Sequence, residues 1–373
     1  MGLGIDKLGL NCYSITHMCK RVKILITGAC CVTARAVARS LRLSPYFKKA
    51  NLIGIDICRN LYGVYEGLYA RVYRVPRWDD EQYPKAVNQV IVKEGISAAV
   101  VIPELEAVYW SVHSLGIPHL SIPPGFCKIA ISKERLYQAL VHSDLVPEFQ
   151  ILDRQAARSA LIGVRFPVWV REFEEGSTSG RGSLIARSPE ELVAWFDLRR
   201  NMQRAMIASV LPGKNFACFL LFLRGSLLKV GVAERIEYIM SNVALSGITG
   251  NTARGRLLNR EDISDVSLRA VRHLCAVTGE TMNGLVTVDL REDETGRPRV
   301  TEINLRPVAF TSAFAQAGFN LSEYQLHCAL GQEADVPPEQ ERRYPGQNIV
   351  LRDVDGLPLY VSNPSPVPDA LTM

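Results

Sequence analysis

Short aliphatic runs alternate with helical stretches over the first hundred residues of this 373-residue chain. RVKILIT (21–27), NLIGIDI (51–57) and AAVVIPE (98–104) have the length and apolar content of buried strands, and apolar residues at helical spacing lie between them. Strands separated by helices predict a parallel sheet with helices on both faces. We therefore expect a Rossmann-like α/β unit over residues 21–124, preceded by an N-terminal extension of residues 1–20.

The turn after the first aliphatic run, ITGACCVT, is poor in glycine. A dinucleotide fingerprint, G-x-G-x-x-G, needs several glycines so that the backbone can approach the pyrophosphate closely. This turn has Gly28 alone. An NAD-dependent oxidoreductase, which would bind nicotinamide near Gly28, is therefore disfavoured.

The remainder of the chain has a different pattern, in which strands follow one another directly. Residues 166–173 (FPVWVREF) form a strong β-stretch, and residues 215–239 predict two antiparallel strands joined near Gly225. A helix is expected over residues 261–277, and LVTVDLREDETGRPRVTEINL predicts a hairpin with its turn at residues 294–296. This pattern is typical of an α+β fold with antiparallel sheets, to which QNIVLRD adds one strand.

Charge and cysteine content narrow the class of protein. The net charge of +5 is small for this length, so it favours small anionic ligands mildly and does not indicate nucleic acid. The nine cysteines form no C-x-x-C pair, which favours reduced thiols over disulfides or a zinc site. The longest fully apolar run, 216–223, is far below the ~20 residues that span a bilayer. We expect a cytoplasmic protein that binds neither nucleic acid nor membrane.

Polar side chains alternate along VTEINLRP (300–307). A period of two places three of them on one face of a strand: Glu302, Asn304 and Arg306. A turn centred at residues 294–295 would pair Asp289 with Val300 and Thr287 with Glu302, which makes Asp289 a diagonal neighbour of Glu302.

Two carboxylates in this position repel each other unless a cation lies between them. Oxygen ligands from Asp289, Glu302 and Asn304 suit Mg²⁺, which takes one or two carboxylates and leaves the rest to phosphates and water. Arg306 is then placed to meet a phosphoryl group or an oxyanion. From these residues alone, a hairpin face that meets only water is the alternative.

The upstream sequence supplies further parts of a nucleotide triphosphate site. Arg171 ends an apolar strand, a loop with Gly176, Gly180 and Gly182 follows it, and Lys133 lies on an earlier helix. Cations and a glycine-rich loop are what polyphosphates need. The sequence contains no P-loop and no kinase H-R-D set.

In this order, SKERLYQAL, FPVWVREFEEGSTSGRG, ERIE, GITGNT, TVDL and EINLRP resemble the ATP-grasp superfamily, over about residues 22–332. The resemblance is closest to the branch of the carbamoyl phosphate synthetase large chain and the carboxylate–amine ligases. It implies a Rossmann-like pre-ATP-grasp domain (21–124) and an ATP-grasp linker and lid subdomain (125–211). A larger catalytic subdomain (212–335) and a C-terminal segment with one strand (336–373) would follow.

The resemblance also implies an activity. Such ligases use ATP and Mg²⁺, with Mn²⁺ as an alternative ion, to join a carboxylate to an amine through an acyl phosphate, releasing ADP and phosphate. The implied partners are a small-molecule carboxylate, such as an amino acid or small carboxylic acid, and an amine. A homodimer is the default assembly. A catalytically degenerate protein that binds a nucleotide or metabolite is the alternative function.

Residue roles follow from the same resemblance. It implies ATP contacts for Lys133, Arg171, Gly176, Ser177, Thr178, Ser179, Gly180, Ser209, Leu211 and Asn215. It implies metal ligation by Asp289, Glu302 and Asn304, and stabilisation of the transferring phosphoryl group by the catalytic Arg306. The resemblance also places Thr249 beside the phosphates or the acceptor, with an ordinary loop as the alternative. From the sequence itself, Arg254 and Arg256 are candidates for gripping a substrate carboxylate, with solvated loop arginines as the alternative. Thr311 and Ser312 lie near an expected helix N-terminus, which binds anions readily, and a helix cap is the alternative.

The segment ASVLPGKNFACFL departs from the family pattern. Ser209 and Asn215 stand where the family has glutamates that receive the adenine amino group or the ribose hydroxyls. We expect backbone groups around Leu211 to bind the adenine edge and Asn215 to bond a ribose hydroxyl. Glu234 and Arg235, in ERIE, are expected to form part of the site wall, with a plain cross-strand ion pair as the alternative.

Overall fold

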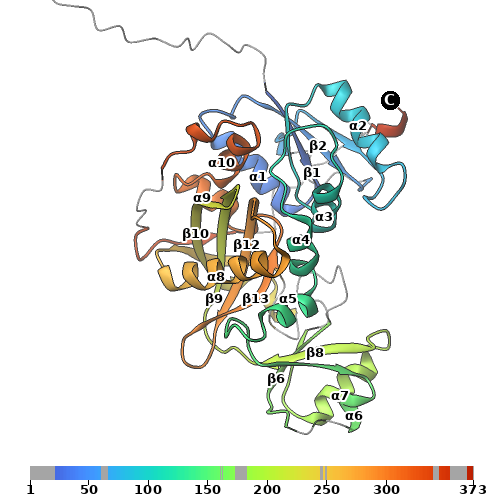
Figure 1. The fold of residues 1–373 in the computed structure, drawn as a ribbon, viewed down its shortest axis with the longest axis vertical. Helices are drawn as coiled ribbons and strands as arrows, with labels where there is room; N and C mark the ends of the chain where they lie inside the picture. The colour runs from blue at the N-terminus through green and yellow to red at the C-terminus, as the bar shows by residue number, and fades with distance from the viewer. Residues whose placement is uncertain are drawn as a thin grey trace, which may run out of the picture.

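Three sheets organise the chain and follow one another from top to bottom in Figure 1. The computed structural model describes residues 22–59, 66–159, 161, 163–172, 183–243, 247, 250–338, 344–352 and 368–372. A parallel sheet lies at the top, a six-stranded sheet in the middle and a four-stranded antiparallel sheet at the bottom. The predicted succession of an α/β unit and an α+β fold is confirmed.

The N-terminal unit (residues 22–59 and 66–112) is the predicted parallel sheet, with strand order β3-β2-β1-β4. Its strands are β1 (Lys23–Thr27), β2 (Asn51–Asp56), β3 (Arg71–Arg74) and β4 (Ala98–Val100), and its helices are α1 (Val32–Leu43), α2 (Tyr83–Glu94) and α3 (Glu104–Val112). The helix α1 covers one face, and α2 and α3 cover the other. β3 was not expected. β4 ends before the expected residue 104 because Pro103, which has no N–H to donate, leads into α3.

A carboxyl group is buried beneath α3 in this unit. Glu106 is 6% exposed, and it accepts a hydrogen bond from the Tyr83 hydroxyl. Trp110 Nε1 donates to the same hydroxyl at 2.9 Å. Burial raises the pKa of Glu106 to about 7, although the hydrogen bonds from Tyr83 and Thr27 oppose the shift.

The stability of the protein is therefore expected to fall as the pH rises from about 4.5 to about 7. The folded state keeps the Glu106 proton at pH values where the unfolded chain has lost it, which is worth up to about 3 kcal/mol of unfolding free energy. Glu106→Gln removes this titration and should flatten the slope in urea unfolding at pH 5, 6, 7 and 8. Glu81→Gln, at an exposed position of the same unit, is the control. An unchanged slope in Glu106→Gln would contradict the prediction.

The small sheet, at the bottom of Figure 1, has strand order β5-β8-β6-β7 and is antiparallel. It consists of β5 (Phe149–Asp153), β6 (Val168–Arg171), β7 (Leu184–Ala186) and β8 (Arg204–Ser209), with α6 (Ala156–Ser159) and α7 (Pro189–Leu198) packed on one face. The predicted β-stretch 166–173 forms β6. The glycine-rich loop 176–182 lies outside the described residues.

The large sheet has strand order β13-β12-β9-β10-β11-β14. Its strands are β9 (Asn215–Leu223), β10 (Ser226–Tyr238), β11 (Thr252–Leu258), β12 (Gly284–Glu292), β13 (Pro298–Asn304) and β14 (Val350–Leu351). One face packs against α4 (Pro124–Ala130), α5 (Lys133–Leu140) and α8 (Glu261–Thr278), and the other against α9 (Thr311–Gln316) and the segment before it. The predicted β9–β10 hairpin at Gly225, the helix at residues 261–277 and the turn at residues 294–296 are confirmed.

A β-bulge changes the predicted register of the β12–β13 hairpin. Asp289 lies directly opposite Glu302, not diagonal to it, and Leu290 lies opposite Val300. Thr301 is the extra residue, and its hydroxyl donates to the Asp289 carbonyl at 3.1 Å. The predicted pairings of Asp289 with Val300 and of Thr287 with Glu302 are therefore wrong. The strands leave the turn one residue out of the predicted register, with Glu292 opposite Pro298, and the bulge adds one more residue, so that Thr287 faces Asn304.

The end of the described chain returns to the N-terminal unit. α10 (Leu321–Ala329) contributes Leu326 to the core beneath α1, and the two helices lie close together at the top of Figure 1. The Arg74 N–H donates to the Pro368 carbonyl at 3.0 Å, and Ala370 is fully buried among α2 and α3 side chains. Within the described chain, no helix combines the length and the apolar character that a membrane crossing requires.

Candidate functional site

Charged side chains gather on the face of the large sheet opposite α8. Val288 and Leu290 point into the core beneath α8, so Asp289, between them, points to the other face. The bulge at Thr301 gives Glu302 and Asn304 the same orientation, because Val300 and Ile303 both reach the α8 core despite their odd spacing. The predicted polar face of the hairpin is thus assembled.

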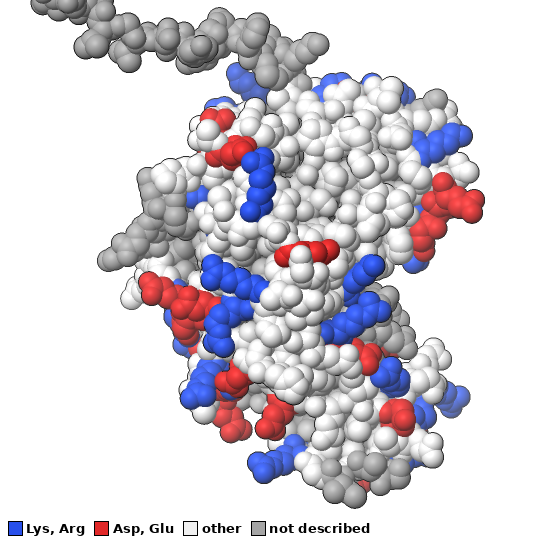
Figure 2. Space-filling model, viewed as in Figure 1, with Lys and Arg blue, Asp and Glu red and all other residues white. Residues whose placement is uncertain are grey.

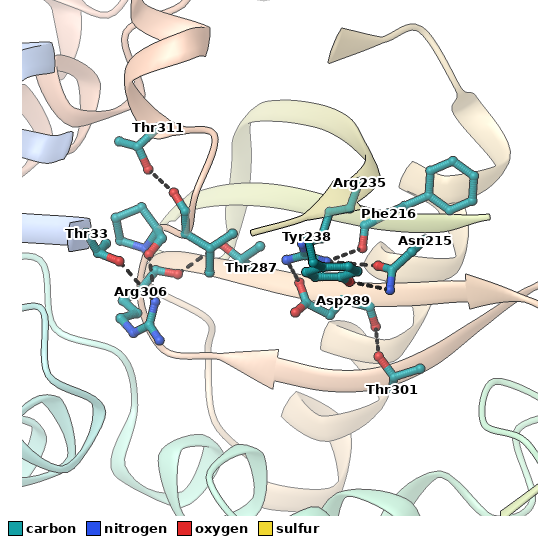
Figure 3. A network of polar contacts seen from close by, with 12 residues as sticks. Thr33, Asn215, Phe216, Arg235, Tyr238, Thr287, Asp289, Thr301, Arg306 and Thr311 are labelled. Atoms are coloured by element: carbon teal, nitrogen blue, oxygen red, sulfur yellow. Dashed lines mark hydrogen bonds and ion pairs between the residues drawn. The ribbon is translucent and has the colours of Figure 1, made fainter. Parts of the chain in front are cut away.

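Arg235, on β10, spans β9 to reach the Asp289 carboxylate (Figure 3). Its guanidinium donates to Asp289 Oδ1 at 2.7 Å, to Asn215 Oδ1 at 3.1 Å and to the Phe216 carbonyl at 3.0 Å. Asn215 Nδ2 in turn donates to the Tyr238 hydroxyl at 2.8 Å. Ala217, which pairs with Asp289 on β9, leaves space for the arginine to cross.

Two further cations lie near Glu302, one on α5 and one at the end of a strand of the small sheet. Lys133, the first residue of α5, lies with its Nζ 3.9 Å from Glu302 Oε2. Arg171, at the end of β6, donates to the Thr301 carbonyl at 2.9 Å and lies over the Tyr137 ring. The structure thus brings Lys133 and Arg171 to the hairpin carboxylates from separate elements.

The two carboxyl groups differ in their electrostatic surroundings. Burial, assisted by the charge of Glu302, raises the pKa of Asp289 to about 6 against the opposing effect of Arg235. Burial also opposes ionisation of Glu302, but Lys133, Arg171 and Arg235 outweigh it and lower the pKa of this group. Burial lowers the pKa of Lys133, and Glu302 opposes that shift. Glu302 is therefore the carboxylate that stays ionised most readily.

The donor set fits a magnesium ion that also binds phosphates. In the part of the chain that the structure describes, no three His, Cys, Asp or Glu side chains gather as a metal cage. The hairpin offers two carboxylates and the Asn304 amide, whose buried Nδ2 has no hydrogen-bond partner. Rotating that amide would present its oxygen instead. This number of protein ligands is what Mg²⁺ takes beside a polyphosphate.

Arg306, just after β13, contacts the N-terminal unit, and Figure 3 shows its hydrogen bond to Thr33. Its Nη1 donates to Thr33 Oγ1 at 3.4 Å, and its Nε lies 3.6 Å from Glu104 Oε1. The Thr287 hydroxyl donates to the Arg306 carbonyl at 2.9 Å. Burial raises the pKa of Glu104, and Arg306 opposes the shift.

The residues predicted to contact ATP beyond Lys133 and Arg171 lie between the end of β8 and the start of β9 and in the glycine-rich loop. The backbone N–H of Ser209 donates to the Glu148 carbonyl at 2.9 Å, and Leu211 is 8% exposed. Both ends of the Asn215 amide are already bonded within the protein. Its bond to a ribose hydroxyl stays a prediction, and its observed role is to hold Arg235. Gly176, Ser177, Thr178, Ser179 and Gly180 lie outside the described residues.

Two of the predicted substrate residues do not join this site. Arg256 donates to Glu234 Oε2 at 2.6 Å, and Glu234 pairs with Phe216, whose ring lies in the α8 core. Arg256 and Glu234 are therefore on the opposite face from Asp289, because neighbouring strand residues alternate. The expectation that Glu234 lines the site is wrong. Arg254, also on β11, pairs with Glu237 at the surface.

The other predicted substrate residues lie near the end of β13 or outside the described chain. Thr311 is fully buried, and its hydroxyl donates to the Val308 carbonyl at 2.6 Å. It starts α9 together with Ser312, which is half-buried. Thr249 lies outside the described residues.

Sequence reasoning missed three contributors to the site: Glu104, Thr33 and Tyr238. Glu104 follows β4 at the carboxyl edge of the parallel sheet, where open α/β sheets bind ligands, and that position was a usable signal. The Asn215–Tyr238 bond depends on strand register, which the sequence does not fix.

On the face shown in Figure 2, acidic and basic side chains are interspersed and neither sign forms a continuous stripe.

No family model and no curated protein matches this sequence. The fold does match solved structures. An L-amino acid ligase from Bacillus licheniformis superimposes with a TM-score of 0.60 at 16% identity, over 85% of this chain and 77% of that one. N5-carboxyaminoimidazole synthetase from Staphylococcus aureus, complexed with ADP, gives 0.63 at 15% identity, over 83% and 78%.

A third match is the biotin carboxylase domain of 2-oxoglutarate carboxylase from Hydrogenobacter thermophilus, in complex with MgADP, ADP and bicarbonate. It gives a TM-score of 0.59 at 16% identity, over 83% of this chain and 69% of that one. What these three proteins share with this chain is the fold, across most of the length of each.

Proposed function

Because this chain has the ATP-grasp fold, we propose that it is an ATP- and Mg²⁺-dependent ligase that joins a carboxylate to an amine. The observation that carries the proposal is the convergence on Glu302. Lys133, on α5, lies 3.9 Å from this carboxylate, and Asp289 lies opposite it on the hairpin. Arg171, from the small sheet, donates to the carbonyl of the preceding residue, Thr301. Cations beside hard oxygen ligands are the arrangement that phosphoryl transfer from ATP requires.

Separate residues of the site would bind the phosphates and the metal ion. Lys133 and Arg171 would neutralise phosphate oxygens, and the hairpin residues Asp289, Glu302 and Asn304 would hold the metal ion. That ion would supply charge neutralisation for the transferring phosphoryl group. Catalysis here would consist of positioning and electrostatic stabilisation.

The proposed reaction has two steps. An oxygen of the substrate carboxylate attacks the γ-phosphorus, the bond to the bridging oxygen breaks, and ADP leaves with that electron pair. The amine then attacks the acyl carbon, phosphate leaves, and the amine loses a proton. Arg306 would stabilise the charge that develops on the phosphoryl oxygens.

The substrates are proposed to be an amino acid or a small carboxylic acid and an amine. The structural likeness to an L-amino acid ligase supports this choice. ADP and MgADP in the other two matched structures support ATP and Mg²⁺, and Mn²⁺ is the alternative ion.

The test is release of ADP and phosphate from ATP and Mg²⁺, screened against pools of amino acids, small acids and amines. One pool is expected to stimulate release, and Glu302→Gln should abolish it. Glu237→Gln, an exposed carboxylate on β10, should keep it. ATP binding without turnover in any pool would favour a nucleotide-binding protein over a ligase, and no ATP binding would also refute the proposal.

A further inference from the structure

Arg235 is a fixed cation inside the site. Its side chain is 8% exposed, and three separate acceptors hold its guanidinium: Asp289 Oδ1, Asn215 Oδ1 and the Phe216 carbonyl. Asn215 is itself held by Tyr238. An arginine keeps its charge at any pH at which a protein is folded, so this positive charge is a permanent part of the site.

The position of Arg235 sets Asp289 apart from Glu302. Asp289 is 14% exposed and carries a guanidinium 2.7 Å from one of its oxygens. Glu302 is 37% exposed, and its ion pair with the Lys133 ammonium, among the described residues, is longer, at 3.9 Å. A divalent ion placed on Asp289 would lie against a guanidinium in direct contact with that carboxylate, whereas Lys133 lies farther from Glu302. The buried Asn304 Nδ2 has no hydrogen-bond partner, so rotating that amide would offer its oxygen on the same face of the hairpin as Glu302.

Arg235 also does part of what a metal ion would do. Two facing carboxylates need positive charge between or beside them, and Arg235 supplies one such charge without any bound ion. A second divalent ion bound at Asp289 would be repelled by Arg235. Its ligand would be a carboxylate that already forms an ion pair with that arginine.

We propose that Arg235 is a built-in counter-ion for Asp289, so that the site takes one divalent ion per bound nucleotide, held by Glu302 and Asn304. The proposal rests on the proposed function and narrows its metal ligands from Asp289, Glu302 and Asn304 to Glu302 and Asn304. Arg235 is thus a positioning residue that sets the metal content of the site.

The experiment counts Mn²⁺ ions on the full chain in the presence of a non-hydrolysable ATP analogue. Free Mn²⁺ is measured by its electron paramagnetic resonance signal, and bound analogue by equilibrium dialysis. The wild-type protein is expected to bind one Mn²⁺ per analogue. Glu302→Gln should weaken Mn²⁺ binding by at least about tenfold, whereas Asp289→Asn should weaken it by a clearly smaller factor, because Asp289 is not a ligand.

Arg235→Met provides the converse result. Removing the guanidinium frees Asp289, and a second Mn²⁺ per analogue is expected. Arg254→Met, at the surface of the neighbouring strand, removes the same charge and should leave the count at one. The wild-type count and the Asp289→Asn affinity keep the proposal testable if Arg235→Met does not fold.

The possible results distinguish a failure of this inference from a failure of the proposed function. Two Mn²⁺ per analogue on the wild-type protein, or equal losses in Asp289→Asn and Glu302→Gln, would overturn the role of Arg235 and leave nucleotide binding intact. Failure to bind the analogue with or without Mn²⁺ would overturn the proposed function and this inference together.

Discussion

Arg306→Ala is expected to lower the turnover number for ligation by about 10²–10³-fold, with little change in KM for ATP. Arg306 lies beyond the metal-binding end of β13, with its guanidinium between Thr33 of α1 and Glu104 of α3. Its side chain is 23% exposed, so part of the guanidinium remains open to a ligand. An interaction that forms mainly in the transition state affects the rate more than binding. Steady-state kinetics with the stimulating substrate pool provides the measurement.

A matched control separates chemistry from the positioning of α1. Thr33→Val removes the hydroxyl that accepts from Arg306 and leaves the positive charge in place. This variant should keep a turnover number close to that of the wild type. If Thr33→Val and Arg306→Ala lose the same activity, the arginine acts by holding the N-terminal unit against the hairpin.

Asp289→Ala is expected to lower the free energy of unfolding by about 3–5 kcal/mol, because it leaves the buried Arg235 without its counter-ion. The Asn215 amide and the Phe216 carbonyl remain as acceptors, but neither carries a charge. Urea unfolding of the protein without ligands measures this effect independently of activity.

The double variant Asp289→Leu/Arg235→Met tests the reason for that loss. Replacing both charged groups by apolar side chains removes the pair and its desolvation cost together, so most of the stability should return. Losses that simply add would show that the two side chains are not coupled, contrary to the 2.7 Å contact.

Much of the fold could be predicted because it depends on local patterns. The aliphatic runs at residues 21–27 and 51–57 form β1 and β2, and the apolar residues between them form α1. Gly225, at a φ of 87°, marks the β9–β10 turn as its sequence position indicated. The alternation in Val300–Asn304 correctly indicated a polar face on β13, since Glu302 and Asn304 point away from the α8 core.

The details of the site depend on pairings between distant residues, which the local pattern does not fix. The bulge at Thr301 has one trace in the sequence: Val300 and Ile303 are both apolar but cannot share a face in a regular strand. Arg235 is separated from Asp289 by a whole strand, so only the sheet order β12-β9-β10 reveals the pair. Arg256 was expected near the substrate, and the register with Glu234 places it on the other face instead.

The packing of residues 368–372 against α2 and β3 has a consequence for how the protein is made. During synthesis the first strands leave the ribosome early, but the N-terminal unit acquires Leu326 and Ala370 only after translation has passed residue 370. At roughly 5–20 residues per second, this unit waits with an incomplete core for tens of seconds. A ribosome-stalled chain ending before α10 would therefore be more sensitive to proteases in its first hundred residues than the released protein.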